Sequence, residues 1–310
     1  MKVFTEPKKL QKWCRARKFA GKKIALVPTM GYLHEGHLSL IAKAKAKGAD
    51  EIVVSVFVNP VQFCPGEDYE KYPRDEKADL AKCRQAGATA VFFPTPANMY
   101  LDRHSVYVNE EDLSKGLCGA RRPGHFRGVC TVVAKLFNLA HPDFAVFGQK
   151  DYQQVQVIKR MVRDLNFDLE IVVAPIVREE SGLARSSRNT YLSAEEKARA
   201  LAISRSLGSL SVGAGSARVG AGSARVGVGS AKTIGSQKAP KTLKTLSDPN
   251  RPLKTLSDLK KSLEKSGLRV DYVACVDAET LEPRKRIEKG CCVLVAVYDG
   301  KTRLIDNILI

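Results

Sequence analysis

Stretches of four to eight mostly apolar residues alternate with helix-like patterns along the first part of the chain. The apolar stretches are Ile24–Val27, Glu51–Val58, Ala90–Phe93, Phe144–Phe147 and Leu169–Ala174. Between them, apolar residues recur with helical spacing at Leu38–Lys47, Asp75–Gln85, Val129–Ala140 and Tyr152–Asp164. Apolar strands separated by helices are typical of a parallel sheet that is covered on both faces. The pattern therefore predicts an α/β fold with a doubly wound parallel sheet, whose first strand begins at Ile24.

A repetitive segment interrupts the chain at about residues 208–256. Three near-identical heptads, VGAGSAR, VGAGSAR and VGVGSAK, occupy Val212–Lys232, and LKTLSD follows twice. Each glycine in a helix costs about 1 kcal/mol relative to alanine, so heptads with two glycines do not favour a coiled coil. Residues 201–268 contain twelve Lys and Arg but three Asp and Glu, which is +9 of the formal net charge of +18. We expect a flexible, basic, low-complexity insert.

The residues after the insert show a second pattern. Val270–Val276, Cys292–Tyr298 and Thr302–Ile305 are candidate strands of a small α+β domain. Helical patterns near Ala194–Leu207 and Leu256–Ser266 flank the insert. We therefore expect two domains, residues 1–180 and residues 181–310.

The segment VPTMGYLHEGHLSLI, Val27 to Ile41, follows the first predicted strand. In open α/β sheets, ligands bind beyond the carboxyl ends of the strands. His34 and His37 are three residues apart at a predicted helix start, so both can face one ligand, and Gly36 allows a base or ribose to approach the backbone. The amino terminus of the helix favours phosphate. The segment thus indicates a nucleotide site.

Four further polar clusters are expected at strand ends of the same sheet. FGQKDYQQ contains Lys150 after a turn glycine, and a lysine there can bind a triphosphate as a point charge. The other three are GLARSSRNTYLS with Ser186, Ser187 and Arg188, FVNPVQF with Asn59 and Gln62, and RPGHFRGV with His125 and Arg127 before a helix. Together the five clusters favour a single phosphate-binding active site over isolated surface groups.

These motifs, with the terminal RLIDNI, resemble those of the pantoate–β-alanine ligase family, and we expect the plant or algal type. The resemblance covers about residues 3–205 and 268–310. It implies a Rossmann-like sheet of the HxGH nucleotidyltransferase type with a smaller C-terminal α+β domain. Arg185 stands where family members usually carry Met or Leu.

The resemblance implies a two-step reaction in coenzyme A (vitamin B5) biosynthesis. ATP and pantoate give pantoyl adenylate and pyrophosphate, and β-alanine then displaces AMP. A carboxylate is ionised at pH 7, so its attack on the α-phosphorus needs no general base. The enzyme must instead align the reactants and stabilise charge on the phosphates.

The resemblance also implies the site residues. The catalytic residues would be His34, His37, Lys150 and Arg188, with His37 as a proton donor. Pantoate or β-alanine would contact Gln62, Gln154 and Asn59. ATP would contact Met30, Gly31, Tyr32, Leu33, His34, Glu35, Gly36, His37, Gly148, Gln149, Lys150, Asp151, Val177, Arg185, Ser186, Ser187 and Arg188. Mg²⁺ would arrive with ATP, because no carboxylate cluster suggests a fixed metal site, and no tightly bound cofactor is expected.

Three other functions share some of these features. Another adenylyl- or cytidylyltransferase of this superfamily would share HxGH but should lack the Gln62 and Gln154 pair. A class I aminoacyl-tRNA synthetase would need an anticodon-binding domain, for which the roughly 50 residues after the insert leave no room. An RNA-binding protein should interleave aromatic and basic residues, and the insert contains no Phe, Tyr or Trp.

Composition bears on location and partners. No apolar run reaches the roughly 18 residues of a membrane span, and the eight scattered cysteines contain no CxxC pair. The basic N-terminus has helical spacing at Leu10, Trp13, Cys14 and Arg17, which predicts a surface helix. We expect a cytoplasmic protein with reduced thiols that binds small molecules, neither a membrane nor nucleic acid. The family resemblance implies a homodimer.

Overall fold

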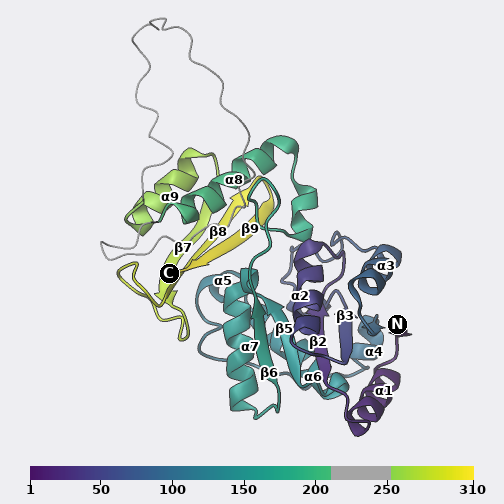
Figure 1. The fold of residues 1–310 in the computed structure, drawn as a ribbon. Coiled ribbons are helices and arrows are strands. Elements are labelled where there is room, and N and C mark those ends of the chain that lie inside the picture. The colour runs from purple at the N-terminus through teal and green to yellow at the C-terminus, as the bar shows by residue number, and fades with distance from the viewer. Residues whose placement is uncertain (211–252) are drawn as a thin grey trace, which may run out of the picture.

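The computed structural model describes residues 1–210 and 253–310, which form two separate sheets (Figure 1). The larger sheet has six parallel strands in the order β1-β4-β3-β2-β5-β6. Its strands are β1 (Lys2–Phe4), β2 (Ile24–Thr29), β3 (Glu51–Val56), β4 (Ala90–Phe92), β5 (Phe144–Gly148) and β6 (Glu170–Ala174). The predicted doubly wound parallel sheet is confirmed. Most of the predicted insert lies outside the described residues.

The prediction that the first strand begins at Ile24 is wrong. The short edge strand β1 precedes it and pairs with β4. Two of its three residues are exposed, so β1 lacks the apolar run that marks the central strands.

Helices cover both faces of the six-stranded sheet. Alternate residues of β2 point to opposite faces, so Ile24 and Leu26 join one core while Ala25 and Val27 join the other. The first core contains α1 (Pro7–Phe19), α6 (His125–Ala140) and α7 (Tyr152–Asp164), and the second contains α2 (Glu35–Ala46) and α3 (Glu76–Ala86). The short helices α4 (Pro96–Met99) and α5 (Leu117–Arg121) lie in connections.

The smaller sheet contains three antiparallel strands in the order β7-β8-β9. They are β7 (Arg269–Asp277), β8 (Cys291–Asp299) and β9 (Thr302–Leu309). The helices α8 (Ala194–Gly208) and α9 (Leu256–Lys265) share an apolar core with this sheet (Figure 1). The predicted α+β character of this part is confirmed.

The chain order places a crevice between β2 and β5. From β2 the chain continues to β3 on one side, whereas β5 pairs with β2 on the other side. A reversal of this kind leaves an opening at the carboxyl ends of the two strands. The turns with His34 and Lys150 follow these two strand ends. No helix among residues 1–210 and 253–310 has the length and apolar character needed to span a membrane.

Candidate active site

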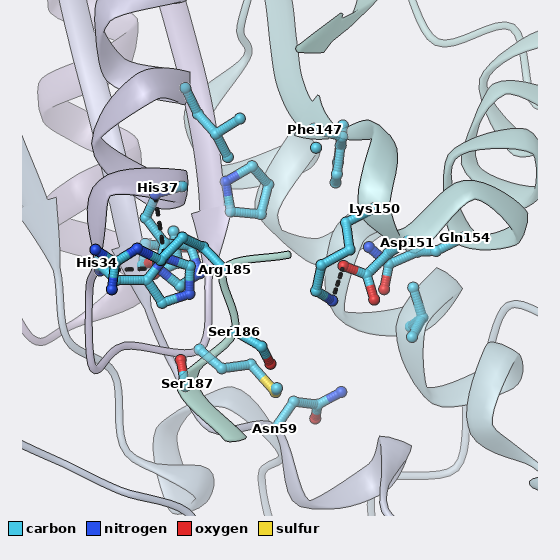
Figure 2. Close-up of a pocket in the computed structure, with 18 of the residues that line it drawn as sticks. His34, His37, Asn59, Phe147, Lys150, Asp151, Gln154, Arg185, Ser186 and Ser187 are labelled. Atoms are coloured by element: carbon cyan, nitrogen blue, oxygen red, sulfur yellow. Dashed lines mark hydrogen bonds and ion pairs between the residues drawn. The ribbon is translucent and has the colours of Figure 1, made fainter. Parts of the chain in front are cut away.

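A cavity of about 210 Å³ lies at the carboxyl ends of β2, β3 and β5. Figure 2 shows His34, His37 and Arg185 on one side of it, and Lys150, Asp151 and Gln154 on the other. Ser186 lies between these groups, and Ser187 lies on the side of the histidines. Strand-end turns of the large sheet and the loop after β6 therefore converge on one space.

The two histidines occupy the amino terminus of α2. The helix begins at Glu35, earlier than the predicted Leu38, and His34 caps it: its Nδ1 accepts a hydrogen bond from Gly36 N at 3.1 Å. The Nδ1 of His37 accepts from His34 N at 3.3 Å. A Cβ at Gly36 would lie 2.9 Å from His34 Nδ1, so only glycine leaves room for this cap. Both rings therefore present a protonated Nε2 as a donor.

Both imidazoles are neutral at physiological pH. Burial, followed by the positive charge of Lys150, lowers the pKa of His34 from 6.5 to about 4. Burial and the nearby His34 and Lys150 lower the pKa of His37 well below its ordinary value. The site can thus offer hydrogen-bond donors without adding two positive charges beside Lys150.

The turn before His34 is strained and is clamped by α3. Gly31 and Tyr32 both have positive φ angles, 86° and 51°. The buried carboxylate of Asp79 accepts hydrogen bonds from Tyr32 N at 2.8 Å and Leu33 N at 2.7 Å. Lys82 Nζ donates to Leu33 O at 2.6 Å. These bonds offset the cost of the left-handed conformation at Tyr32.

Lys150 lies on the short 3₁₀ helix η2 (Gln149–Asp151), between β5 and α7. Its Nζ is 3.2 Å from Asp151 Oδ2. Burial is the largest influence on the pKa of Asp151 and would raise it, but the charge and hydrogen bond of Lys150, together with the electrostatic effects of Arg188 and His125, outweigh burial and lower that pKa. Both residues point into the cavity (Figure 2), so a cation stands at its wall with its counter-charge beside it.

Arg188 belongs to the 3₁₀ helix η3 (Ser187–Tyr191) and is engaged by Asp68. The distances are 2.9 Å from Nε to Oδ2 and 2.8 Å from Nη2 to Oδ1. Burial by itself would lower the pKa of Arg188, but the hydrogen bonds and the negative charge of Asp68 raise it. Ser186 caps η3, and Ser187 Oγ donates to Tyr32 O at 3.3 Å. The loop therefore also supports the turn before His34.

Arg185 lies over the start of α2. Its Nε is 3.2 Å from Glu35 Oε2, and its Nη1 is 3.7 Å from Glu179 Oε1. Its backbone N donates to Val177 O at 2.9 Å. This arginine thus closes one side of the cavity beside His34 (Figure 2).

Asn59 directly precedes the 3₁₀ helix η1 (Pro60–Gln62), which follows β3, and Gln62 is the last residue of that helix. Asn59 Nδ2 donates to Gln62 Oε1 at 3.1 Å, and Tyr100 Oη donates to Asn59 Oδ1 at 2.6 Å. Gln62 Nε2 lies 3.1 Å from Met30 Sδ. Both amides are buried and their orientation is set by these partners.

A second hydrogen-bond network holds η1 through the carbonyl of Gln62. Arg122 Nη1 donates to His125 Nε2 at 2.9 Å, so His125 Nδ1 carries the proton and donates to Gln62 O at 2.8 Å. Burial and Arg122 lower the pKa of His125 to about 3. Glu67 binds Arg122 through two bonds of 2.6 and 2.8 Å.

The RPGHFRGV cluster therefore mainly holds η1 in place and contributes little to the lining of the 210 Å³ cavity. His125 and Arg127 are in the first turn of α6, not before the helix as predicted, and neither lines the 210 Å³ cavity. The expectation that five clusters follow strand ends is also wrong. Three follow β2, β3 and β5, whereas η3 lies in a loop and His125 opens a helix.

Most predicted site residues do line the 210 Å³ cavity. They are Met30, His34, Gly36, His37, Asn59, Gln62, Gly148, Lys150, Asp151, Gln154, Val177, Arg185, Ser186, Ser187 and Arg188. Gly31, Tyr32, Leu33, Glu35 and Gln149 do not.

Several lining residues were not foreseen. Apolar side chains of α6 form one wall, among them Val129, Val132, Val133 and Leu136. Tyr72 also lines the cavity, from a segment distant in sequence. The helical spacing at Val129–Ala140 predicts a helix, but no local pattern distinguishes a helix face that packs in the core from one that borders a ligand.

A larger cavity of about 970 Å³ adjoins the first. It lies between the two sheets and shares Lys150, Asp151, Gln154, Ser186 and Arg188 with it. Residues of β9 line its far side, including Arg303 and Asp306. Within the described part of the chain, no group of three or more His, Cys, Asp and Glu is arranged to hold a metal ion.

Comparisons with known proteins agree on one family. A family model described as Pantoate-beta-alanine ligase matches residues 2–309. Pantothenate synthetase of Clostridium novyi (strain NT) is 48% identical over 304 residues, which are 97% of this chain and 95% of that protein. Pantothenate synthetase of Thermosipho africanus is 45% identical over the full length of both chains. These relatives are bacterial and give no support to a plant or algal type.

Solved structures give the same result. The crystal structure of pantothenate synthetase from Thermus thermophilus has a TM-score of 0.79 and 37% identity, covering 99% of each chain. Pantoate-beta-alanine ligase from Francisella tularensis, complexed with beta-gamma ATP and beta-alanine, has a TM-score of 0.75 and 29% identity. That comparison covers 100% of this chain and 97% of the other.

Proposed function

Since this chain belongs to the pantoate–β-alanine ligase family and condenses pantoate with β-alanine in an ATP-dependent reaction, we propose that the 210 Å³ cavity is where pantoate is activated. A carboxylate oxygen of pantoate attacks the α-phosphorus of ATP, and the bond to the β-phosphate oxygen breaks, which releases pyrophosphate. The amine of β-alanine then attacks the acyl carbon of the adenylate, and AMP leaves.

The donors for the phosphates are proposed to be His34, His37 and Lys150. The two neutral imidazoles have protonated Nε2 atoms because each Nδ1 accepts a backbone N–H. Lys150 adds a positive charge, and the amino terminus of α2 adds a partial one. Such preorganised donors stabilise charge that develops on the phosphates as the bond to pyrophosphate breaks. This convergence of donors at the switch point of the sheet is the observation that carries the proposal.

Pantoate is proposed to lie between Gln62, Gln154 and the apolar wall of α6. The amides can donate to its hydroxyl and carboxylate oxygens, while the α6 wall fits its methyl groups. Asn59 would act by holding the Gln62 amide, with which it shares a 3.1 Å hydrogen bond.

ATP is proposed to span both cavities. A volume of about 210 Å³ is below the roughly 300–1,000 Å³ of usual ligand pockets, whereas the adjoining cavity of about 970 Å³ adds the required room. The nucleoside would lie near Gly36, Val177 and Arg185. The triphosphate would extend past Lys150 toward Ser186, Ser187 and Arg188. Ser186 and Arg188 line both cavities, and Ser187 lines the 210 Å³ cavity.

Magnesium is proposed to bind with the nucleotide. Asp151 is the single carboxylate among the residues that line the 210 Å³ cavity, and it is paired with Lys150. A hard cation that prefers six oxygen ligands would thus take most of them from phosphate and water. When bound, it would neutralise charge on the phosphates.

The two-step scheme is tested by isotope exchange. The protein should exchange labelled pyrophosphate into ATP when pantoate is present and β-alanine is absent, because the adenylate forms before the amine is needed. Exchange that requires β-alanine would contradict the scheme. Exchange without pantoate, or with CTP in place of ATP, would favour the alternative of another nucleotidyltransferase.

Three further properties remain predictions. A domain boundary near residue 180 is supported by the end of β6 at Ala174 and by the packing of α8 on the small sheet. The homodimer rests on the family resemblance, and light scattering would test it. The cytoplasmic location rests on the same basis and on the scattered cysteines.

A further inference from the structure

The end of β9 reaches across to the turn that carries Lys150. Asn307 is 2% exposed and belongs to the small sheet. Its Nδ2 donates to both Gln149 O and Lys150 O, each at 3.0 Å. Its Oδ1 accepts from Gln149 Nε2 at 3.2 Å. A single side-chain amide thus binds the backbone and a side chain of η2.

These bonds stabilise a turn that has little support of its own. The residue that precedes η2, Gly148, provides no side-chain cap, and η2 contains three residues. Two consecutive carbonyls require two donors in a fixed geometry. The planar Nδ2 group of an asparagine supplies both, while a carboxylate or an aliphatic side chain supplies neither.

The neighbouring residue Asp306 ties the same strand end to a second part of the site. Its carboxylate is 3% exposed and binds Arg178 through contacts of 2.7 and 3.1 Å. It also accepts from Asn307 N at 2.8 Å. Arg178 adjoins Val177, whose carbonyl accepts from Arg185 N. The end of β9 is therefore joined to both walls of the cavity.

We propose that Asn307 is a positioning residue for adenylate formation, which acts through Lys150 by holding the backbone of η2. It does not line the 210 Å³ cavity, and although it borders the 970 Å³ cavity, both N–H groups of its amide and its Oδ1 are bonded to η2. In consequence, the small sheet sets the place from which Lys150 reaches the phosphates. The inference rests on the proposed role of Lys150.

A double-mutant cycle tests it, with single-turnover formation of the adenylate as the readout. A displacement of about 1 Å can cost up to ~10²-fold in rate, so Asn307→Ala should lower the rate tenfold to a hundredfold. In the Lys150→Ala background the same substitution should change the rate less than threefold, because the group that it positions is absent. Asn307→Asp should be impaired to a similar degree, because it keeps the shape of the side chain but cannot donate to the two carbonyls, and thermal unfolding of each variant shows whether the strand end stays packed.

Asn98→Ala is the matched control. Asn98 makes two side-chain bonds to backbone groups, from Thr95 N and to Thr5 O, and it lines neither cavity. Its loss should leave the rate within threefold. Equal losses from Asn307→Ala with and without Lys150, or a parental rate for Asn307→Asp, would overturn the inference. A parental rate for Lys150→Ala alone would instead overturn the proposed role of that lysine.

Discussion

The rings of His34 and His37 are 4.1 Å apart between centroids, close enough that protonation of one opposes protonation of the other. Burial and Lys150 already hold the pKa of His34 at about 4. Each ring keeps one defined donor because the other nitrogen accepts a backbone N–H. At the scale of single residues, the site therefore depends on tautomers that the backbone of α2 selects.

The rate of adenylate formation should accordingly show no titration near pH 6.5. We expect a flat pH–rate profile between about pH 5.5 and 8, because the neutral imidazoles persist over that range. A pH profile of pantoate-dependent exchange checks this, and loss of activity with an apparent pKa between about 6 and 7 would contradict it.

The low pKa of His34 also makes the stability of the fold depend on pH. Below about pH 6.5 the unfolded chain binds protons that folded His34 does not, so the free energy of unfolding falls as the pH falls toward 4.

Removal of one donor should be costly. Lys150→Ala and His37→Ala should each slow adenylate formation by ~10²–10³-fold, as expected for the loss of a group that stabilises the transition state. Single-turnover rates measure this. Lys159→Ala, an exposed lysine on the adjoining helix α7, is the matched control and should be near-parental. A rate within threefold of the parent for either variant would remove that residue from the catalytic set.

At the scale of elements, the contact between η1 and α6 is unusually close. A Cβ at Gly128 would lie 2.4 Å from Val61 O and 2.6 Å from Gln62 Cα, so only glycine allows η1 to lie against this helix. The carbonyl of Gly128 also accepts from Asn59 Nδ2 at 3.2 Å. The position of Gln62 thus depends on a missing side chain in another element.

Gly128→Ala should therefore displace η1 and weaken the use of pantoate. Steady-state kinetics should show an increase of about tenfold or more in KM for pantoate, since a misplaced amide leaves polar groups unmatched at a cost of ~1–3 kcal/mol. The affinity for ATP should change little. Gly208→Ala is the control, because a Cβ there meets no atom within 4 Å. An equal loss of ATP affinity would mean that η1 serves both substrates.

At the scale of the whole molecule, the residues on either side of the segment 211–252 meet. Leu253 N donates to Ser209 O at 2.9 Å, and Leu210 and Leu253 form a β-bridge. Both flanking helices, α8 and α9, pack on the small sheet away from the 210 Å³ cavity. The two chain ends that flank residues 211–252 are therefore joined by their own backbone contacts.

Replacement of residues 211–252 by a short Gly-Ser linker should leave the reaction largely intact. Each doubling of loop length changes the closure free energy by about 0.6 kcal/mol, so stability should also change little. Steady-state kinetics and thermal unfolding of the shortened chain, beside the full chain, measure both effects. A loss of kcat/KM beyond tenfold in a folded variant would show that the segment serves the active site.

The sequence alone determined the class of fold and most of the lining of the cavity. Apolar strands and helical spacing are local patterns, and His34, Lys150 and Gln62 stand in turns that directly follow predicted strands. Because parallel strands end at one edge of a sheet, their turns had to meet. The exposed edge strand β1 could not be predicted in this way, since its residues lack the periodicity of buried strands.

Only the tertiary structure decided which distant residues support the site. Asp68 pairs with Arg188 across 120 positions, and Asn307 binds the η2 turn across 157. The tertiary structure also places the Gln149 side chain against Asn307, to which it donates a hydrogen bond, and places His125 against the carbonyl of Gln62. A polar side chain carries no local mark of its partner, because the partner is set by the strand order and by the docking of the small sheet. Burial then requires each such group to find a partner there.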